Sequence, residues 1–327
     1  VLHDYVTYVV DGEEVYNRDG IIAYRVTPPA PQAQVLTDLG TDEAHLNVGE
    51  GWSESRHQYV WAQRREACLL VYLSRQGQEM TLRSMAPGQG QTVEVVANSH
   101  AVGTLALSEG WQEYQVLLPV TYLREGLNEF CFRFGRLYPV EQVREGDYAI
   151  GTTGISSPVN ILVKSAGEEV GDFGHIYVDG VNVSPDERGY NMVVLDPVSG
   201  QVEETGHFDT FLHQDESRLM ADFIARIPEG KIVAVAVEDE ASLNLTEEAV
   251  QALRSIGAGE DLRGMFRWGH AIIGVKGAAP GQALETTGVL RPELVRVGQA
   301  FTEPASAAAF DQVIFRAADR FAGATGL

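Results

Sequence analysis

The stretch from Arg188 to Glu285 constrains the fold most, because each change of secondary structure along it has its own boundary residues. It reads RGYNMVVLDPVSGQVEETGHFDT, then an amphipathic segment, then GKIVAVAVEDEASLNLTEEAVQALRSIGA and MFRWGHAIIGVKGAAPG. The apolar spacing predicts the order strand, turn, strand, helix, buried strand, helix, strand. A compact α+β domain follows from this order.

Two helices are predicted within this stretch. The first runs from about Glu216 to Ile227, with its apolar residues on one face and a proline and a glycine after its end. The second starts after Thr246, carries acidic residues in its first turn and stops at Gly257. The run KIVAVAVED between them is almost continuously apolar, which predicts a strand covered on both faces.

Four blocks of this stretch occur in the same order in a known family. They are RG-x-N-x-VVL with Gly200, FDT at 208–210, V-x-DE-x-S at 237–242 and FRW with IGVKG at 266–277. The stretch therefore resembles the FAM3 or interleukin-like EMT inducer (ILEI) domain, which is also the stem domain of protein O-mannose N-acetylglucosaminyltransferase. The resemblance covers roughly the last third of the chain and implies a lectin-like or ligand module.

The chain before this domain is predicted to be all-β. From about His45 to Lys164, runs such as ACLLVYLS, QTVEVVAN, YQVLLPV, NEFCFRFG and VNILVKS are bounded by turn residues. Strands at this spacing predict a sandwich or jelly roll. The segment from Val93 to Phe134 also resembles carbohydrate-binding-type jelly rolls.

The predicted fold is mainly β, a jelly-roll-like β-sandwich followed by a FAM3/ILEI-like α+β domain of small sheets with two helices. Its predicted parts are a strand-rich segment and linker at 1–34, the sandwich at 35–166, the ILEI-like domain at 167–288 and a tail at 289–327. The tail runs LVRVGQA and FDQVIFRAAD are expected to return to the sandwich, because apolar strands need a partner face.

The N-terminal segment contains two turn signals, Asp11-Gly12 and Asp19-Gly20, which predict a meander of short strands. The following TPPAPQAQ, at 27–34, is typical of an extended linker. Because the chain opens in strand-like residues without an initiating Met, we interpret it as part of something longer.

Cys68 and Cys131 each lie in an apolar, strand-like run. Two cysteines are too few for a disulfide framework. A bond between neighbouring strands and two buried thiols are both compatible with the sequence. We favour unpaired packing, because a free cysteine behaves as a small hydrophobe.

The formal net charge of −22, from 24 basic and 46 acidic residues, argues against nucleic acid or an anionic membrane surface as a partner. A neutral sugar is compatible with this charge, and so is the simpler view that acidity only keeps the protein soluble. No apolar run approaches the roughly 20 residues that span a bilayer. Membrane attachment is therefore expected only through a parent protein.

Asp239, Glu240 and Ser242 are the first candidate binding residues, where the buried strand ends in a loop. Carboxylates at such a place accept hydrogen bonds from sugar hydroxyls, or satisfy the amides of the turn.

Arg267, Trp268 and His270 precede the next apolar strand, and Lys276 follows it. A guanidinium, an indole face and an imidazole suit the hydroxyls and the apolar face of a sugar. Lys276 is either a ligand contact or a solvated strand end.

The resemblance implies specific roles for two of these residues. In the glycosyltransferase stem, the equivalents of Asp239 and Arg267 line the pocket for a terminal N-acetylglucosamine. The family's R-D-x-W becomes Arg267-Trp-Gly-His270 here, so the carboxylate after the arginine is lost and an imidazole replaces the tryptophan. The alternative role is an Arg–Asp ion pair between adjacent loops.

Other candidate sites are weaker. His207, Asp209, His213 and Asp215 have a spacing that could hold Zn²⁺, but only Asp209 lies in a family block, so we predict no metal and no cofactor. Among the tryptophans, Trp52, Trp61 and Trp111 could form a sugar-stacking platform, with Trp52 expected at the surface and Trp111 in the sandwich. H-E-x-x-H, G-x-S-x-G and Walker patterns are missing from the sequence.

We therefore predict a non-catalytic carbohydrate-binding module for a terminal N-acetylglucosamine-like sugar. It is expected to be the soluble exported part of a larger bacterial membrane-associated glycan-handling protein, on the extracellular or periplasmic side of the envelope. One alternative is a FAM3-type protein-interaction or scaffold domain, marked by an exposed apolar patch without a pocket near Arg267. The other is a glycan-active enzyme, marked by two carboxylates about 5–9.5 Å apart in a cleft.

Overall fold

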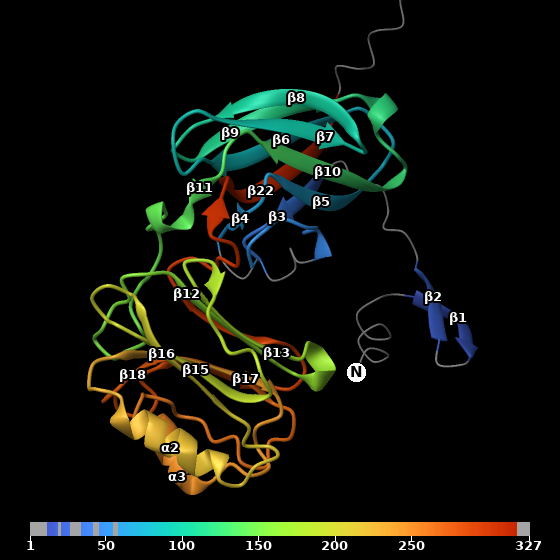
Figure 1. The fold of residues 1–327 in the computed structure, drawn as a ribbon. Helices are drawn as coiled ribbons and strands as arrows, with labels where there is room; N and C mark the ends of the chain where they lie inside the picture. The colour runs from blue at the N-terminus through green and yellow to red at the C-terminus, as the bar shows by residue number, and fades with distance from the viewer. Residues whose placement is uncertain (1–11, 19–20, 27–33, 42–45, 55–57, 319–327) are drawn as a thin grey trace, which may run out of the picture.

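A computed structural model of the chain describes residues 12–18, 21–26, 34–41, 46–54 and 58–318 (Figure 1). It shows a β-sandwich above a second domain in which strands are covered on one side by helices. The two α-helices of the described residues are α2 (Glu216–Arg226) and α3 (Glu247–Arg254). The predicted mainly β fold is confirmed. No helix within these ranges is long and apolar enough to cross a membrane.

The first domain consists of two facing antiparallel sheets with a shared apolar core. One sheet has the order β5 (Glu66–Leu73), β10 (Gly126–Phe134), β7 (Gln91–Ala97) and β8 (His100–Leu107). The other has the order β3 (Gln34–Asp38), β22 (Ala308–Ala317), β6 (Gln78–Met85) and β9 (Gln112–Leu118), with β4 (Val60–Ala62) also paired to β22. Alternate residues of β5 are buried, as expected for a strand with one face on a core.

The C-terminal tail contributes a strand to each domain. β22 pairs with β6 on one side and with β3 and β4 on the other, so it is a central strand of the sandwich. β20 (Glu293–Val297) instead pairs with β12 (Ile161–Gly167) in the second domain. The expectation that both tail runs return to the sandwich is therefore wrong for LVRVGQA, because Val295 and Val297 are buried in the core of the second domain.

β12 was also assigned to the sandwich by the sequence, and the structure places it in the second domain instead. It pairs antiparallel with β13 (Phe173–Val178) and with β20. β11 (Tyr138–Pro139) and β21 (Ala305–Ser306) pair with each other between the domains. The chain passes from the sandwich to the second domain at β11 and returns to the sandwich at β21. The boundary between the domains thus precedes Ile161.

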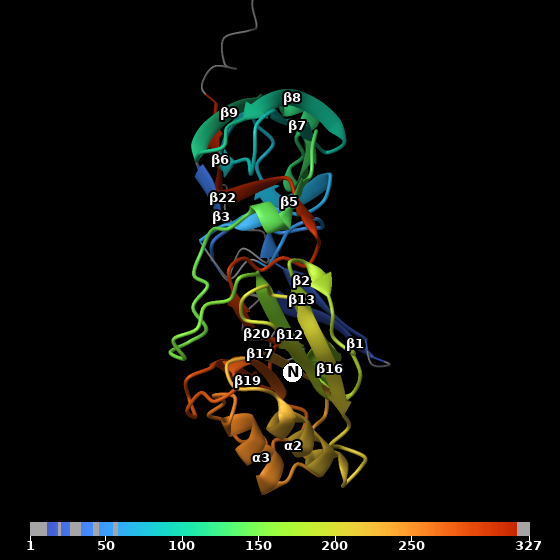
Figure 2. The same cartoon turned by 60° about the vertical axis from the view of Figure 1, so that its left-hand side comes forward.

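The second domain has three layers (Figure 2). The layer towards the sandwich has the order β14 (Val181–Asn182), β13, β12 and β20. The middle layer has the order β16 (Val202–Phe208), β15 (Gly189–Leu195), β17 (Ile232–Asp239), β18 (Gly269–Val275) and β19 (Leu284–Gly288). One apolar core lies between these layers, and another lies between the middle layer and the helices. β17 is therefore covered on both faces, as its sequence predicts.

The two helices form for local reasons that the sequence shows. The buried residues of α2 include Met220, Phe223 and Ile224, which recur at helical spacing on one face. At the start of α3, the hydroxyl of Thr246 accepts a hydrogen bond of 3.3 Å from the amide of Ala249. These helices cover the side of β17 that faces away from the sandwich (Figure 1).

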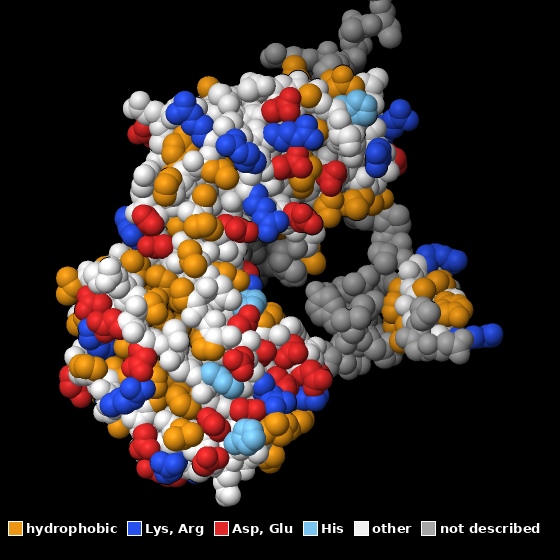
Figure 3. Space-filling view, in the orientation of Figure 1, with side chains coloured by type: hydrophobic (Ala, Val, Ile, Leu, Met, Phe, Trp, Pro, Cys, Tyr) orange, Lys and Arg blue, Asp and Glu red, His pale blue; other side chains and the backbone are white. Residues whose placement is uncertain are grey.

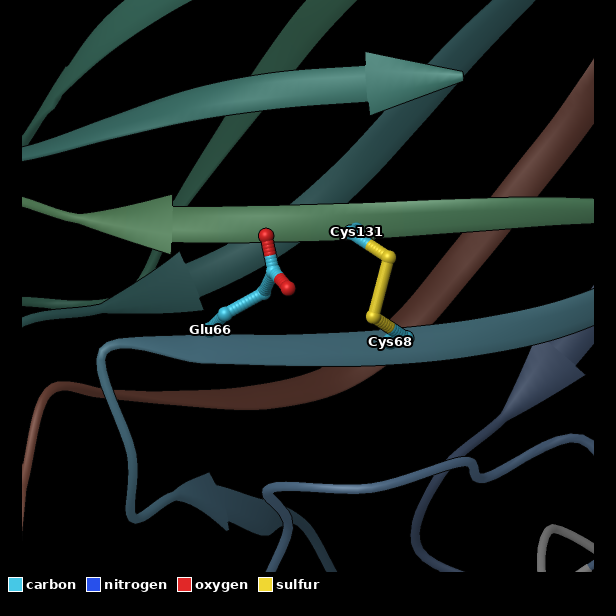
Figure 4. A group of neighbouring side chains, drawn as sticks. All are labelled: Glu66, Cys68 and Cys131. Carbon is cyan, nitrogen blue, oxygen red and sulfur yellow. A yellow bond between two sulfur atoms is a disulfide. The ribbon is translucent and has the colours of Figure 1, made fainter. Parts of the chain in front are cut away.

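Cys68 and Cys131 form a disulfide, so the expectation of unpaired thiols is wrong (Figure 4). The register of β5 and β10 places the two residues directly opposite each other, with their Cα atoms 4.1 Å apart. Opposite residues of antiparallel strands are near enough for their side chains to bond. The pairing follows from the register, which the sequence does not reveal.

The N-terminal segment forms the antiparallel hairpin of β1 (Gly12–Arg18) and β2 (Ile21–Val26). Asp11, the turn at 19–20 and the linker residues 27–33 lie outside the described residues.

Trp52, expected at the surface, is buried against Phe132 and Phe310. The ring of Trp52 packs edge to face against each of the two phenylalanine rings.

Candidate functional site

Loops from several elements meet where β17 ends. Asp239 is the last residue of β17 and pairs with Gly167 at the end of β12. Charged residues from neighbouring loops surround it. We call the following set the loop edge: Glu168, Glu169, Arg188, Asp209, Asp239 and Arg267. Figure 3 shows acidic and basic side chains gathered at the right-hand margin of the second domain.

Arg188 and Asp209 form an ion pair of the loop edge through two hydrogen bonds. Nη2 and Nε of Arg188 lie 2.8 and 3.2 Å from Oδ2 of Asp209. Burial by itself would raise the pKa of Asp209, but the hydrogen bonds from Arg188 and from two backbone amides lower it below its ordinary value. The guanidinium also lies 5.4 Å from the ring centre of Phe211.

Asp239 is the acceptor of the loop edge with the fewest partners. Its Oδ2 lies 4.0 Å from Nη1 of Arg188, and within the described residues its carboxylate accepts no hydrogen bond. Burial, together with the carboxylates of Asp172 and Glu168, raises the pKa of Asp239 despite the two nearby guanidiniums. The side chain is 22 % exposed, so a ligand can reach it.

Arg267 pairs with carboxylates that the sequence did not indicate. Its guanidinium contacts Glu168 and Glu169, which lie in a short 3₁₀ helix directly after β12. These residues give Arg267 carboxylate partners, although this chain lacks the carboxylate that follows the arginine in the family pattern. The pair of Arg267 with Asp239 that was the alternative expectation is not formed, and their interaction is only a longer-range attraction.

Glu240 holds the loop edge in place from within. Its side chain is buried, and its two oxygens accept hydrogen bonds from the backbone amides of Ser242 and Arg267. Both Asp239 and Arg267 have positive φ, at 54° and 60°. Non-glycine residues rarely adopt this conformation, and it persists where surrounding contacts impose it. Glu240 thus satisfies turn amides, the second of the two roles considered for these carboxylates, and Ser242 supplies one of those amides.

The remaining predicted residues lie away from this surface. Trp268 is half-buried and packs against the core under the helices. His270 is fully buried, and its Nε2 lies 2.7 Å from a carboxylate oxygen of Glu285. Lys276 follows the opposite end of β18, where it donates a hydrogen bond of 3.0 Å to the hydroxyl of Ser255. The structure therefore gathers Asp239, Glu240, Ser242 and Arg267, but neither His270 nor Lys276.

Exposed apolar side chains border the loop edge. Phe266 is 56 % exposed, and its ring centre lies 5.0 Å from the guanidinium of Arg267. Leu212, Leu243 and Met265 are also exposed on the three neighbouring loops. These loops are joined by the contacts of Asn244 with the 210–211 backbone and of Glu240 with Arg267. Phe266 was not among the predicted binding residues. The sequence signal for it was its position in the FRW block, directly before the predicted Arg267.

The predicted histidine–aspartate group has other contacts. Nε2 of His207 lies 2.6 Å from the backbone oxygen of Arg188, and Asp209 pairs with the guanidinium of the same residue. Across the described ranges, the group of three or more possible ligand residues whose atoms lie within metal-binding distance of one another is Glu66, Cys68 and Cys131 (Figure 4). The two sulfurs of that group are bonded to each other, so neither is a thiolate ligand.

The loop edge is an open surface. Four cavities bounded by described residues have volumes of about 280 to 460 Å³ and lie in the sandwich or at its junction with the second domain. No residue of the loop edge lines any of these four.

Fold and site together define a two-domain, mainly β protein with an open polar and aromatic surface on its second domain. Residues 188–278 match the family model described as interleukin-like EMT inducer. This part of the chain is therefore an ILEI domain, which confirms the resemblance read from the four sequence blocks.

Curated relatives share part of this chain. The human "Cell migration-inducing and hyaluronan-binding protein" is 37 % identical over 90 residues, which are 28 % of this chain and 7 % of that protein. The human "Cell surface hyaluronidase CEMIP2" is 33 % identical over 89 residues, 27 % of this chain and 6 % of that protein. The matched part is thus a small fraction of these much longer relatives.

Solved structures show only distant likeness. The CBM36-1 domain of a multidomain xylanase from the hindgut metagenome of Trinervitermes trinervoides is 11 % identical, covering 31 % of this chain and 82 % of that chain at a TM-score of 0.24. The beta-glucuronidase of an uncultured Clostridium sp. is 10 % identical, covering 88 % of this chain and 43 % of that chain at a TM-score of 0.18. Scores this low define neither fold nor function for this protein.

Proposed function

We propose that this protein is a non-catalytic carbohydrate-binding module and that the loop edge is its sugar site. The observation that carries the proposal is Asp239, a reachable carboxylate without a hydrogen bond from the described residues, beside the guanidiniums of Arg188 and Arg267. A sugar presents hydroxyls that donate to a carboxylate and accept from N–H groups at the same time. The loop edge offers both partners within one small surface.

The apolar neighbours suit the other face of a sugar ring. Phe266 exposes its ring beside Arg267, and Phe211 lies under Arg188. Sugar C–H groups pack against such aromatic faces while the hydroxyls contact the charges. The ion pairs leave no large net positive charge at the edge, and the chain as a whole is acidic, so a neutral sugar fits better than an anionic one.

The family match supports this proposal. The equivalents of Asp239 and Arg267 in the glycosyltransferase stem line a pocket for a terminal N-acetylglucosamine, and we propose a sugar of that kind here. One relative is named for hyaluronan binding. Hyaluronan is an anionic polysaccharide, so this name supports glycan binding in general and not the choice of a neutral sugar.

We also propose that the module acts outside the cytoplasm. The Cys68–Cys131 disulfide is typical of oxidising compartments, and a relative is named for the cell surface. Attachment to a larger, bacterial, membrane-associated glycan-handling protein belongs to the same proposal and draws on the sequence alone. The test is cell fractionation of the longer parent protein. Recovery of the parent in the envelope fraction would support the proposal.

The proposal is tested on a glycan array with three proteins: wild type, Arg267→Ala and Lys276→Ala. Lys276→Ala is the matched control, because it removes a cation at the opposite end of β18. Wild type and the control are expected to bind the same glycans, and Arg267→Ala to lose them while its circular dichroism is unchanged. Equal binding by all three proteins would show that the sugar lies elsewhere.

A second candidate function is docking of another protein at the same loops. The observation in its favour is the exposed apolar group of Leu212, Leu243, Met265 and Phe266. Its test is the double variant Leu243→Ser/Phe266→Ser. Loss of self-association or of partner binding in this variant, but not in Arg267→Ala, together with a silent glycan array, would favour docking.

A further inference from the structure

A separate cavity lies where the two domains meet. It has a volume of about 280 Å³ and is lined by Gln58, Tyr59, Gly146, Asp147, Arg296 and Gln299. These residues come from the entry to β4, from the segment that connects the domains and from the end of β20. β4 lies at the base of the sandwich, facing the second domain (Figure 1). The volume is near the lower end for small-molecule sites and suits one ring.

Arg296 is the unusual residue of this cavity. Among the described residues its guanidinium forms no salt bridge and is attracted by Asp147 only at longer range, although the chain has 46 acidic residues. Nη1 donates to the backbone oxygen of Gly298, while Nε is buried and makes no hydrogen bond. Burial lowers the pKa of Arg296, which shows that the cation is poorly solvated. An acceptor supplied by a ligand would stabilise it.

Asp147 supplies the complementary charge on another wall. One oxygen of its carboxylate, Oδ1, accepts a hydrogen bond of 2.9 Å from the amide of Ala149. The residue is exposed, and Asp147 attracts Arg296 without forming a salt bridge with it. The cavity therefore presents a donor and an acceptor that do not satisfy each other.

An aromatic wall completes the cavity, and its position is fixed. The hydroxyl of Tyr59 accepts a hydrogen bond of 3.1 Å from Nε2 of Gln299 and lies 3.2 Å from a carboxylate oxygen of Glu145. The Tyr59 ring packs edge to face with Trp111, at 5.2 Å between centres, and with Trp61, at 6.0 Å. Oε1 of Gln299 also accepts from the indole N–H of Trp61, at 3.0 Å.

From this arrangement we propose that the cavity binds a single neutral pyranose ring. Arg296 donates to one ring hydroxyl, Asp147 accepts from another, and the Tyr59 ring packs against the C–H face. A free carboxylate is a poorer ligand, because Asp147 and Glu145 would repel it. This site is distinct from the loop edge and does not depend on sugar binding there.

Glycine at 146 leaves the cavity open. Its φ is 106°, and a Cβ atom at this position would lie 3.1 Å from Nε2 of Gln299. A side chain at 146 would therefore strain the backbone and press on the amide that positions Tyr59. Glycine at 146 avoids both effects and keeps the space between the domains unobstructed.

The test is a titration of the full chain with methyl glycosides of glucose, galactose, mannose, xylose and N-acetylglucosamine, and with D-glucuronate. Tryptophan fluorescence follows the binding, because Trp61 and Trp111 contact Tyr59. At least one neutral glycoside is expected to bind wild type and to bind about tenfold more weakly to Arg296→Met and Asp147→Asn, as for loss of one hydrogen bond to a charged group.

Two controls make the outcome specific. Asp147→Asn keeps an oxygen for the Ala149 amide and lies on the surface, so it tests the site even if Arg296→Met is poorly folded. Lys276→Ala, which removes a cation outside both proposed sites, is expected to leave this titration unchanged. No response to any neutral glycoside, equal affinity in wild type and Asp147→Asn, or tighter binding of D-glucuronate than of every neutral glycoside would overturn the proposal.

Discussion

Replacing Glu238 by glutamine is expected to stabilise the protein above pH 7, although it removes a charge from a strand end. Glu238 is the penultimate residue of β17, opposite Gly189 of β15. Its Oε2 is buried and has no hydrogen-bond partner among the described residues. Burial, followed by the carboxylates of Asp186, Asp172 and Asp239, raises its pKa from 4.5 to about 7.

The size and sign of the effect follow from this pKa. For an acid whose pKa is higher in the folded protein, the free energy of unfolding is highest below the pKa of the unfolded state. It falls as the pH rises through the pKa of the folded state. A difference of 2.5 units corresponds to about 3 kcal/mol at most. Because Glu238 is partly in contact with solvent, screening reduces this to about 1 to 2 kcal/mol.

The assay is urea unfolding followed by circular dichroism at pH 4.5 and pH 8, on wild type, Glu238→Gln and the exposed control Glu260→Gln. Glu238→Gln is expected to unfold at higher urea concentration than wild type at pH 8, and at a similar concentration at pH 4.5. The control is expected to match wild type at both values. If Glu238→Gln were no more stable than wild type at pH 8, the carboxylate would not be the destabilising group that the structure indicates.

Three further changes have expected outcomes. Replacing Cys68 and Cys131 by serine should lower the free energy of unfolding by about 4 kcal/mol, given the 63-residue separation, and reductant should do the same to wild type; a loss below about 1 kcal/mol in urea would contradict this. Glu240→Ala leaves two backbone amides without their acceptor and should cost about 3 kcal/mol in the same assay, whereas an unchanged midpoint would remove its role as a clamp. Burial alone would raise the pKa of Glu285, but the bond to His270 and two backbone amides lower it, so its stabilising effect is present above its ordinary pKa and lost as the pH falls. In Glu285→Gln the free energy of unfolding should therefore fall less steeply as the pH is lowered. An acid dependence equal to that of wild type would refute this.

Elements whose signals are local could be predicted from the sequence. The start of α3, both ends of α2 to within one residue and the double burial of β17 follow from apolar spacing and from the residues that start and end each element. α3 ends at Arg254, three residues before the predicted end at Gly257. The partners of β12 and β20 could not be predicted in this way. Both strands are short apolar runs that would fit either sheet, and their pairing depends on contacts far apart in the chain.

The same distinction applies to the candidate site. Asp239 and Arg267 could be placed near each other because both lie at ends of strands that proved to be adjacent in the sheet. Glu169, which pairs with Arg267 from 98 residues away, carried no sequence signal. The sequence predicts His270 as a ligand-binding residue, but the pairing of β18 with β19 buries it beside Glu285. Which side of a strand faces solvent depends on the layers that cover it.

The most direct test of sugar binding at the loop edge is a backbone amide NMR titration with a methyl glycoside of N-acetylglucosamine. The account predicts progressive, saturable shifts confined mainly to residues 209–212, 239–243 and 265–268, and their loss in Arg267→Ala. Shifts confined to residues 58–59, 146–147 and 296–299, or no shifts at millimolar ligand, would contradict the assignment of the sugar site to the loop edge.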